Sequence, residues 1–169
     1  NADLDSARYF GSYIDAAGIR YLLLERIPGV RLWECAEFEP WREAARWLAR
    51  MHARVTVETA GASRAAAHLL RYDRPFYESW MERAELFHAS HSAVSRLAAR
   101  HAHIVDRLLD ERTAFLHGEF YSENILVQRR AGAMAVRPID WEMAAFGPAF
   151  VDLAYLVAGR WSDNERADV

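Results

Sequence analysis

The sequence contains only one cysteine, Cys35, so no disulfide can form within the chain. Free thiols without disulfides are typical of reducing compartments, and we expect a cytoplasmic location. No apolar run reaches the roughly 20 residues that span a bilayer. Pro148 and Asp152 interrupt the longest candidate, residues 146–159. The first residues also lack the basic and apolar stretches of a signal peptide. We therefore expect no membrane partner.

Basic residues are not in excess: 21 Lys plus Arg stand against 24 Asp plus Glu, which gives a net charge of −3 at pH 7. A protein that binds nucleic acid through a general basic field needs the opposite balance, so we expect no nucleic-acid partner. Hydrophobic residues make up 52% of the 169 positions, which is sufficient for one compact domain with a core. The chain lacks an initiator methionine, and we expect it to be part of a longer protein.

The N-terminal segments 8–14 and 19–27 are rich in β-forming residues and flank the turn residues 15–18. Such a pattern predicts a β-hairpin. Pro28 and Gly29 then end the second strand with a turn.

Three later segments predict helices, at residues 40–55, after Pro75 and at about 92–110, with a loop at 56–63 after the first. In each helix apolar residues recur at intervals of three and four, which places them on one face. His52 lies on the apolar face of the first helix, where we expect a satisfied core histidine. The second helix carries an aromatic stripe that is most simply core and alternatively lines a binding pocket: Tyr77, Trp80 and Phe87.

Beyond Arg112 the helical pattern gives way to short apolar segments. Residues 125–128 and 135–139 predict two brief strands joined by the turn 129–132. Gly147-Pro148 predicts another turn, before a final helix that starts near position 149. Polar residues concentrate around the short strands, and loops on such rigid elements are where functional residues gather.

The polar residues of this region combine carboxylates, one histidine and one carboxamide: His117, Glu119, Glu123, Asn124, Asp140 and Glu142. Oxygen ligands on rigid loops suit Mg²⁺, and Asn124 with Asp140 would supply such a pair. Glu119 could accept a proton from a hydroxyl. Acidic residues on loops, taken alone, are most simply a solvated surface, and this is our interpretation of Glu123. The joint spacing of the others matches the needs of phosphoryl transfer.

Residues 117–124, His-x-Glu-x-x-x-x-Asn, resemble the catalytic loop of the protein-kinase-like superfamily. Residues 139–142, Ile-Asp-Trp-Glu, resemble the metal-binding segment that follows that loop. With Gly-Pro and Asp-Leu-Ala downstream, the pattern is similar to the aminoglycoside phosphotransferase and choline kinase group. Residues 21–29 resemble the hinge between the two lobes in that group, and residues 47–53 resemble one of its helices.

The resemblance implies a small-molecule kinase that uses ATP and Mg²⁺ to transfer the γ-phosphoryl group to a hydroxyl of an aminoglycoside-like compound or another metabolite. It implies that Asn124, Asp140 and Glu142 bind Mg²⁺. Glu119 stands where the family has its catalytic aspartate.

The same resemblance assigns supporting roles to four residues. His117 would hold the shape of the catalytic loop, and Asp152 would brace that loop by accepting its backbone N–H groups. Glu25 and Ile27 would offer hinge backbone groups to adenine.

Two departures from the family pattern keep a second hypothesis open. Glu119 replaces an aspartate, and a displacement of 1 Å can cost about 100-fold in rate. The chain also has no Gly-rich phosphate loop and no strand Lys–helix Glu pair, so we expect it to be inactive in isolation. The alternatives are a catalytically inactive kinase-like module that binds nucleotide or acts as a scaffold, and an unrelated helical interaction protein.

The fold class that we predict is α+β and protein kinase-like. Residues 1–27 would be the end of a β-rich N-lobe, consisting of a hairpin and a hinge strand. Residues 28–169 would form most of the helical core of the C-lobe. The acceptor, the choice between ATP and GTP, and the oligomeric state stay open.

Overall fold

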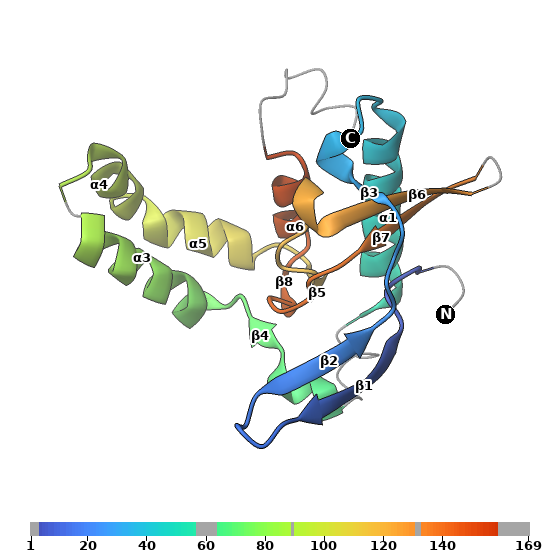
Figure 1. Ribbon diagram of the computed structural model, residues 1–169. Helices are drawn as coiled ribbons and strands as arrows, with labels where there is room; N and C mark the ends of the chain where they lie inside the picture. The colour runs from blue at the N-terminus through green and yellow to red at the C-terminus, as the bar shows by residue number, and fades with distance from the viewer. Residues whose placement is uncertain (1–3, 57–63, 89, 131–132, 159–169) are drawn as a thin grey trace. The chain divides into compact units, whose positions relative to one another are not determined.

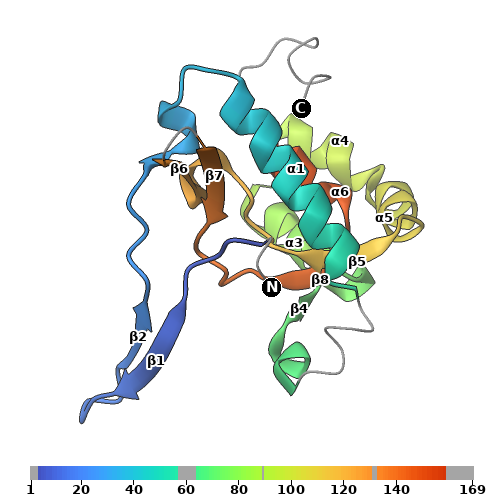
Figure 2. The same cartoon turned by 90° about the vertical axis from the view of Figure 1, so that its right-hand side faces the viewer.

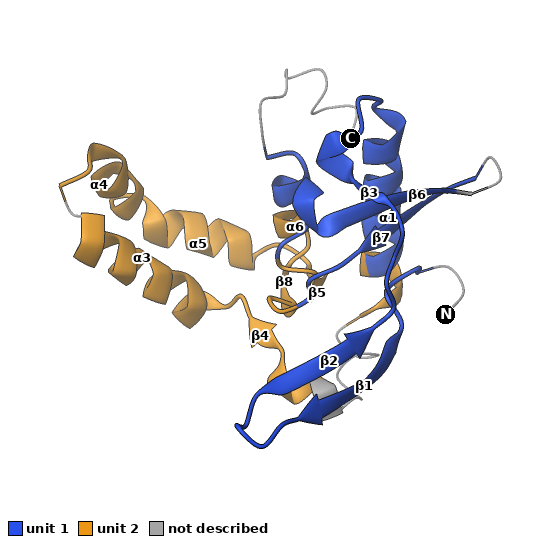
Figure 3. Ribbon diagram, in the orientation of Figure 1, with its two compact units in different colours: residues 1–51, 119–141, 153–169 blue, residues 52–118, 142–152 orange. Residues whose placement is uncertain are grey.

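A computed structural model of the chain describes residues 4–56, 64–88, 90–130 and 133–158. These residues form two compact units built from interleaved segments (Figure 3). Unit 1 comprises residues 1–51, 119–141 and 153–169, and unit 2 comprises residues 52–118 and 142–152. The described residues form both helices and strands, which confirms the predicted α+β class. A boundary between lobes at residue 27 stays a prediction.

The predicted hairpin is present in unit 1, as strands β1 (Tyr9–Ile14) and β2 (Arg20–Leu24) (Figure 1). The carboxylate of Asp15 closes its turn by accepting the N–H groups of Ala17 and Ile19. The chain then runs from β2 to the second sheet of unit 1, as Figure 2 shows.

The second sheet of unit 1 has the strand order β3-β6-β7. Its strands are antiparallel and span Val30–Arg31 (β3), Ile125–Arg130 (β6) and Ala133–Pro138 (β7). Both predicted strands are confirmed, and they extend further than predicted into the turn, of which residues 131–132 lie outside the described residues. The short 3₁₀ helices η1 (Leu32–Glu34) and η3 (Ser122–Asn124) flank the sheet segments in sequence.

Helix α1 (Glu39–Arg54) confirms the first predicted helix. Four residues of the predicted apolar face are buried, Trp41, Ala44, Leu48 and Met51, and Trp47, which the prediction did not place on that face, is buried as well. Within unit 1 the Trp47 ring stacks on Phe120, with the ring centroids 5.7 Å apart. Burial of aromatic and aliphatic side chains at this density fixes the helix against Phe120 of the predicted catalytic loop.

Unit 2 contains a sheet of strand order β4-β8-β5. Its strands span Leu70–Arg71 (β4), Thr113–Leu116 (β5) and Ala145–Pro148 (β8). The predicted turn at Gly147-Pro148 is therefore wrong. Pro148 is the last residue of β8, where its missing N–H does little harm. Gly147 allows close packing, since an added Cβ would lie 2.7 Å from Cβ of Tyr72.

Unit 2 also holds a 3₁₀ segment and three helices, η2 (Arg64–His68), α3 (Arg74–His88), α4 (Ser92–Ala98) and α5 (His101–Leu109). One helix over 92–110 was predicted, and the break between α4 and α5 corrects it. Both helices pack against α3 (Figure 1). The last helix, α6 (Phe150–Leu156), begins one residue after the predicted start. The predicted loop at 56–63 lies almost wholly outside the described residues.

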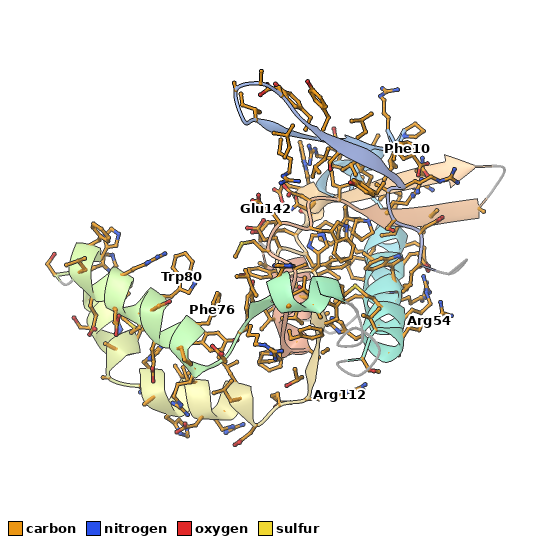
Figure 4. The ribbon with its side chains drawn as sticks, turned by 90° about the horizontal axis from the view of Figure 1, so that it is seen from below. Phe10, Arg54, Phe76, Trp80, Arg112 and Glu142 are labelled. Carbon is orange, nitrogen blue, oxygen red and sulfur yellow. The ribbon has the colours of Figure 1, made fainter. Side chains whose placement is uncertain are left out.

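The aromatic stripe of α3 is less buried than a core stripe would be. Tyr77 packs beside Tyr72 in the core of unit 2, but Trp80 and Phe87 are 50% and 73% exposed. Phe76 and Trp80 project from the same side of α3, with ring centroids 6.3 Å apart (Figure 4). The core interpretation is therefore wrong for Trp80 and Phe87. No helix among the described residues is long and apolar enough to cross a membrane.

Candidate active site

The predicted catalytic loop starts where β5 ends, and Gly118 marks the point. Gly118 has a φ of +86°, a left-handed conformation that side chains disfavour. A Cβ at this position would lie 2.0 Å from the carbonyl oxygen of Met143. Only glycine fits such a close approach, so the sequence His-Gly both ends the strand and sets the direction of the loop.

Asp152 holds the start of this loop within unit 2. Its carboxylate accepts the N–H of His117 at 2.8 Å and the N–H of Gly118 at 2.9 Å. His52 Nε2 lies 3.3 Å from the same carboxylate, which confirms the expectation of a satisfied histidine. Asp152 and His117 are both fully buried. Hydrogen bonds to a buried carboxylate are charge-assisted and strong, so this corner of the loop is rigid.

The rest of the loop lies in unit 1 and carries Glu119 and Asn124. The hydroxyl of Tyr121 donates to Oε1 of Glu119 at 2.7 Å. Nδ2 of Asn124 donates to the carbonyl oxygen of Glu119 at 3.1 Å, and the side chain is 9% exposed. With its nitrogen committed to the loop, Asn124 would offer its amide oxygen to a cation.

Asp140 approaches the same loop from the end of β7. The N–H of Ile139 donates to the carbonyl oxygen of Asn124 at 2.9 Å. Asp140 itself has a φ of +65°, an uncommon conformation that costs about 1–3 kcal/mol and clusters at functional sites. A carboxylate oxygen of Asp140 and one of Glu119 lie within 4.8 Å of each other.

These oxygen donors fit a hard cation such as Mg²⁺, which binds carboxylate and amide oxygens and keeps several waters. Asn124 and Asp140 belong to the same unit and are joined through Ile139, so the structure brings this predicted pair together. Glu142 is exposed and belongs to unit 2. Its predicted contact with the metal stays a prediction.

A pocket with a volume of about 680 Å³ lies beside Asp140 within unit 1. Its lining is mainly apolar, and it comes from four stretches of chain: Ser6, Ala7, Tyr9, Leu24, Glu25, Ile27, Leu126, Ile139, Asp140 and Trp141. The predicted hinge residues Glu25 and Ile27 and the predicted ligand Asp140 thus line one cavity. A mainly apolar pocket of this size with a few polar groups is typical of a small-molecule site.

Glu25 of the predicted hinge forms an ion pair with Arg137. Nη1 and Nη2 of Arg137 donate to the two carboxylate oxygens of Glu25, at 3.0 and 2.9 Å. Hydrogen bonding to Arg137 is the largest cause that lowers the pKa of Glu25 to about 2, and the N–H of Arg8 adds to it. The same hydrogen bonds raise the pKa of Arg137. The carboxylate is therefore charged at any physiological pH.

Sequence reasoning missed three residues of this region. Tyr121 and Trp141 stand inside the two quoted motifs, and their positions beside Glu119 and Asp140 were the available signal. Arg137 carried no such signal, because its partner Glu25 is 112 positions away in the sequence.

Solved structures with a similar fold include aminoglycoside phosphotransferases and a choline/ethanolamine kinase family protein. Aminoglycoside phosphotransferase APH(3'')-Id from Streptomyces rimosus matches with a TM-score of 0.69 and 21% identity, over 99% of this chain and 65% of that protein. A choline/ethanolamine kinase family protein from Mesorhizobium loti matches with a TM-score of 0.57 and 17% identity, over 96% of this chain and 53% of that protein. The fold is therefore kinase-like, as predicted.

The sequence comparisons agree with the fold. Viomycin phosphotransferase from Streptomyces vinaceus is 27% identical over 167 residues, which cover 88% of this chain and 58% of that protein. The model of the phosphotransferase enzyme family (APH) matches residues 5–169. The chain belongs to this family. It spans 58% of the length of viomycin phosphotransferase and 65% of the length of APH(3'')-Id.

Proposed function

We propose that the protein containing this chain transfers the γ-phosphoryl group of ATP to a hydroxyl of a small molecule, with Mg²⁺. One observation carries the proposal. The predicted hinge and the predicted metal ligand Asp140 line the same pocket. A carboxylate oxygen of Glu119 lies within 4.8 Å of one of Asp140, and the carbonyl oxygen of Asn124 accepts the N–H of Ile139, the residue before Asp140. A phosphotransferase needs a site for the nucleotide base, then metal ligands beside the phosphates, and then a group that accepts the proton of the acceptor hydroxyl.

The apolar walls of the pocket would hold the adenine ring. Leu24 and Ile27 come from the hinge side, and Leu126 and Ile139 come from β6 and the end of β7. The N–H of Glu25 already donates to the carbonyl oxygen of Arg8 at 2.8 Å. The carbonyl of Glu25 is then the group that would accept from the amine of adenine, and the N–H of Ile27 would donate to a ring nitrogen.

The phosphate end would lie against Asp140 and Asn124. Bound Mg²⁺ would neutralise charge on the phosphate oxygens. Glu119 would accept the proton of the acceptor hydroxyl while the hydroxyl oxygen attacks the γ-phosphorus. The bond from the γ-phosphorus to the bridging oxygen breaks, and ADP leaves with the electron pair. Asp152 and His117 would act through the loop, by fixing the backbone that carries Glu119.

The acceptor would be a small, cationic molecule with a free hydroxyl, an aminoglycoside-like antibiotic or another metabolite. One relative is named for viomycin, and APH(3'')-Id has been solved with ADP and streptomycin bound. Such a reaction would draw on ATP in the cytoplasm, the location that the single cysteine favours.

A second candidate is a nucleotide-binding module without catalysis. The hydrogen bond from Tyr121 to Glu119 favours it, because the hydroxyl occupies one oxygen of the proposed base. The two candidates share the pocket and differ in turnover. Both candidates should be stabilised against heat by ATP with Mg²⁺ and not by ATP with excess EDTA. An unrelated helical interaction protein should not be stabilised by ATP with Mg²⁺.

Replacement of the proposed base separates the two candidates. Glu119→Gln keeps the size of the side chain and removes its charge, so phosphotransfer should fall by about 100-fold or more while ADP binding is retained. The measurement is ATP turnover in the presence of candidate acceptors, with ADP binding by titration calorimetry. Glu123→Gln is the matched control, since Glu123 is exposed in the same loop and should behave as wild type. Equal turnover of wild type and Glu119→Gln would rule out Glu119 as the base.

A further inference from the structure

Arg137 occupies an unusual place for an arginine. It lies on β7, it is 6% exposed, and its Nε atom is buried without a hydrogen-bond partner among the described residues. Desolvating an ion pair is costly, and apolar residues of similar size often stabilise a fold as well as a buried ion pair does. The contacts of Arg137 therefore need an explanation beyond stability.

Those contacts join three segments of unit 1. The guanidinium binds the carboxylate of Glu25 through two nitrogens, and Nη2 also donates to the carbonyl oxygen of Ser6 at 2.6 Å. Glu25 in turn accepts the N–H of Arg8 through its Oε2 at 3.1 Å. Ser6 and Glu25 line the pocket, and Arg137 stands three residues before Asp140, which also lines it. The pairing Leu126↔Arg137 places the arginine opposite another lining residue.

We propose that Arg137 is a positioning residue of the nucleotide pocket. It fixes the hinge backbone at Glu25 relative to the strand end that carries Asp140, so that the adenine and phosphate ends of one nucleotide are held at a set separation. This inference rests on the proposed function. A planar fork that binds both carboxylate oxygens sets an orientation as well as a distance, which a lysine or an apolar pair would not do.

The position of the carbonyl of Glu25 is the quantity that the ion pair controls. That carbonyl would accept from the 6-amino group of adenine, and the fork holds the same residue by its side chain. If Arg137 is shortened, the hinge keeps its covalent path but loses the contact that fixes its orientation. The variant should lose recognition of the 6-amino group more than it loses the other contacts between the pocket and the nucleotide.

The test uses the protein that contains this chain, with ADP and purine riboside 5′-diphosphate as probes. The second compound is ADP without the 6-amino group. Wild type should bind ADP more tightly than this analogue. Arg137→Gln should weaken ADP binding by about 10- to 100-fold, the range found for partners that orient metal ligands, and should bring the two affinities together. Titration calorimetry measures both.

Two further variants keep the test decisive. Glu25→Gln, at a side chain that is 31% exposed, should show the same loss of preference if Arg137→Gln does not fold. In the double variant the losses should not add, because the two residues act as one contact. Arg129→Gln on β6 is the control, since Arg129 and Glu37 form an exposed ion pair at 3.1 Å. This variant should keep wild-type affinities.

The outcomes distinguish failure of the positioning role from failure of the proposed function. If wild type binds ADP and prefers it, but Arg137→Gln keeps that preference, the positioning role is overturned and the proposed function stands. A wild type that binds both compounds equally also overturns the positioning role. A wild type that binds neither overturns the proposed function and this inference with it.

Discussion

Two carboxylates support the candidate site in different ways. Asp152 in unit 2 is fully buried and accepts two backbone N–H groups. Glu25 in unit 1 has a side chain that is 31% exposed and binds a guanidinium. Backbone N–H donors are fixed in place by the chain, whereas an ion pair at a pocket edge joins two side chains and is weakened by salt. Asp152 therefore holds the loop backbone in place, and Glu25 with its guanidinium partner orients the hinge.

The largest effect that separates the two carboxylates should come from Asp152→Ala. The change leaves the N–H groups of His117 and Gly118 buried without an acceptor, at about 1–3 kcal/mol each. We expect a loss of about 2–6 kcal/mol in the free energy of unfolding, measured by urea denaturation. Phosphotransfer should fall as well, since Glu119 follows directly. The matched change Glu25→Ala should cost less. Equal losses would mean that burial does not distinguish the two supports.

A second pair of variants measures how tightly the loop itself is packed. Gly118 and Gly18 have φ values of +86° and +82°, but a Cβ on Gly18 meets nothing within 4 Å. Gly18→Ala should cost about 1–2 kcal/mol, which reflects the left-handed conformation alone. Gly118→Ala should cost about 2–5 kcal/mol, because the clash with Met143 adds the usual 1–3 kcal/mol of overpacking. Thermal unfolding of both variants gives the difference, and similar melting temperatures would contradict the packing seen here.

The smallest effect should be the pH dependence of the Glu25–Arg137 pair. The pKa of Glu25 is lowered from 4.5 to about 2 by hydrogen bonds to Arg137 and Arg8. Since the folded state holds the proton less tightly than the unfolded state, the contribution is complete above about pH 4.5 and is lost as the pH falls towards 2. Wild type and Glu25→Gln should therefore differ in unfolding free energy at pH 6, and the difference should shrink below pH 4.5. A difference that is constant from pH 6 to pH 3 would contradict the lowered pKa.

Helices α1 and α3 show how far periodicity alone can predict a fold. Both follow the same spacing of apolar residues, and both exist. Trp41 of α1 is 8% exposed, whereas Trp80 of α3 is 50% exposed. Spacing specifies which residues share a face, but only the elements packed nearby decide whether that face is covered. The break between α4 and α5 was not predicted, because Ala99 and Arg100 are good helix formers and nothing local in the sequence marks the end of a helix there.

The candidate site divides in the same way. The loop from His117 to Asn124 and the segment around Asp140 were found because their residues are close in sequence and stand at set intervals. The hydrogen bonds of Asp152 to the loop followed from the family resemblance. The fork between Glu25 and Arg137 could not be found, because nothing local in either segment refers to the other.

The contact between Arg137 and Ser6 has a consequence for how related sequences should vary. Arg137 binds the carbonyl oxygen of Ser6, a group that every amino acid carries, so position 6 is free to change identity while the link is kept. Positions 25 and 137 are joined through their side chains and should change together or not at all. In an alignment of close homologues, positions 25 and 137 should covary, and position 6 should show no covariation with either of them.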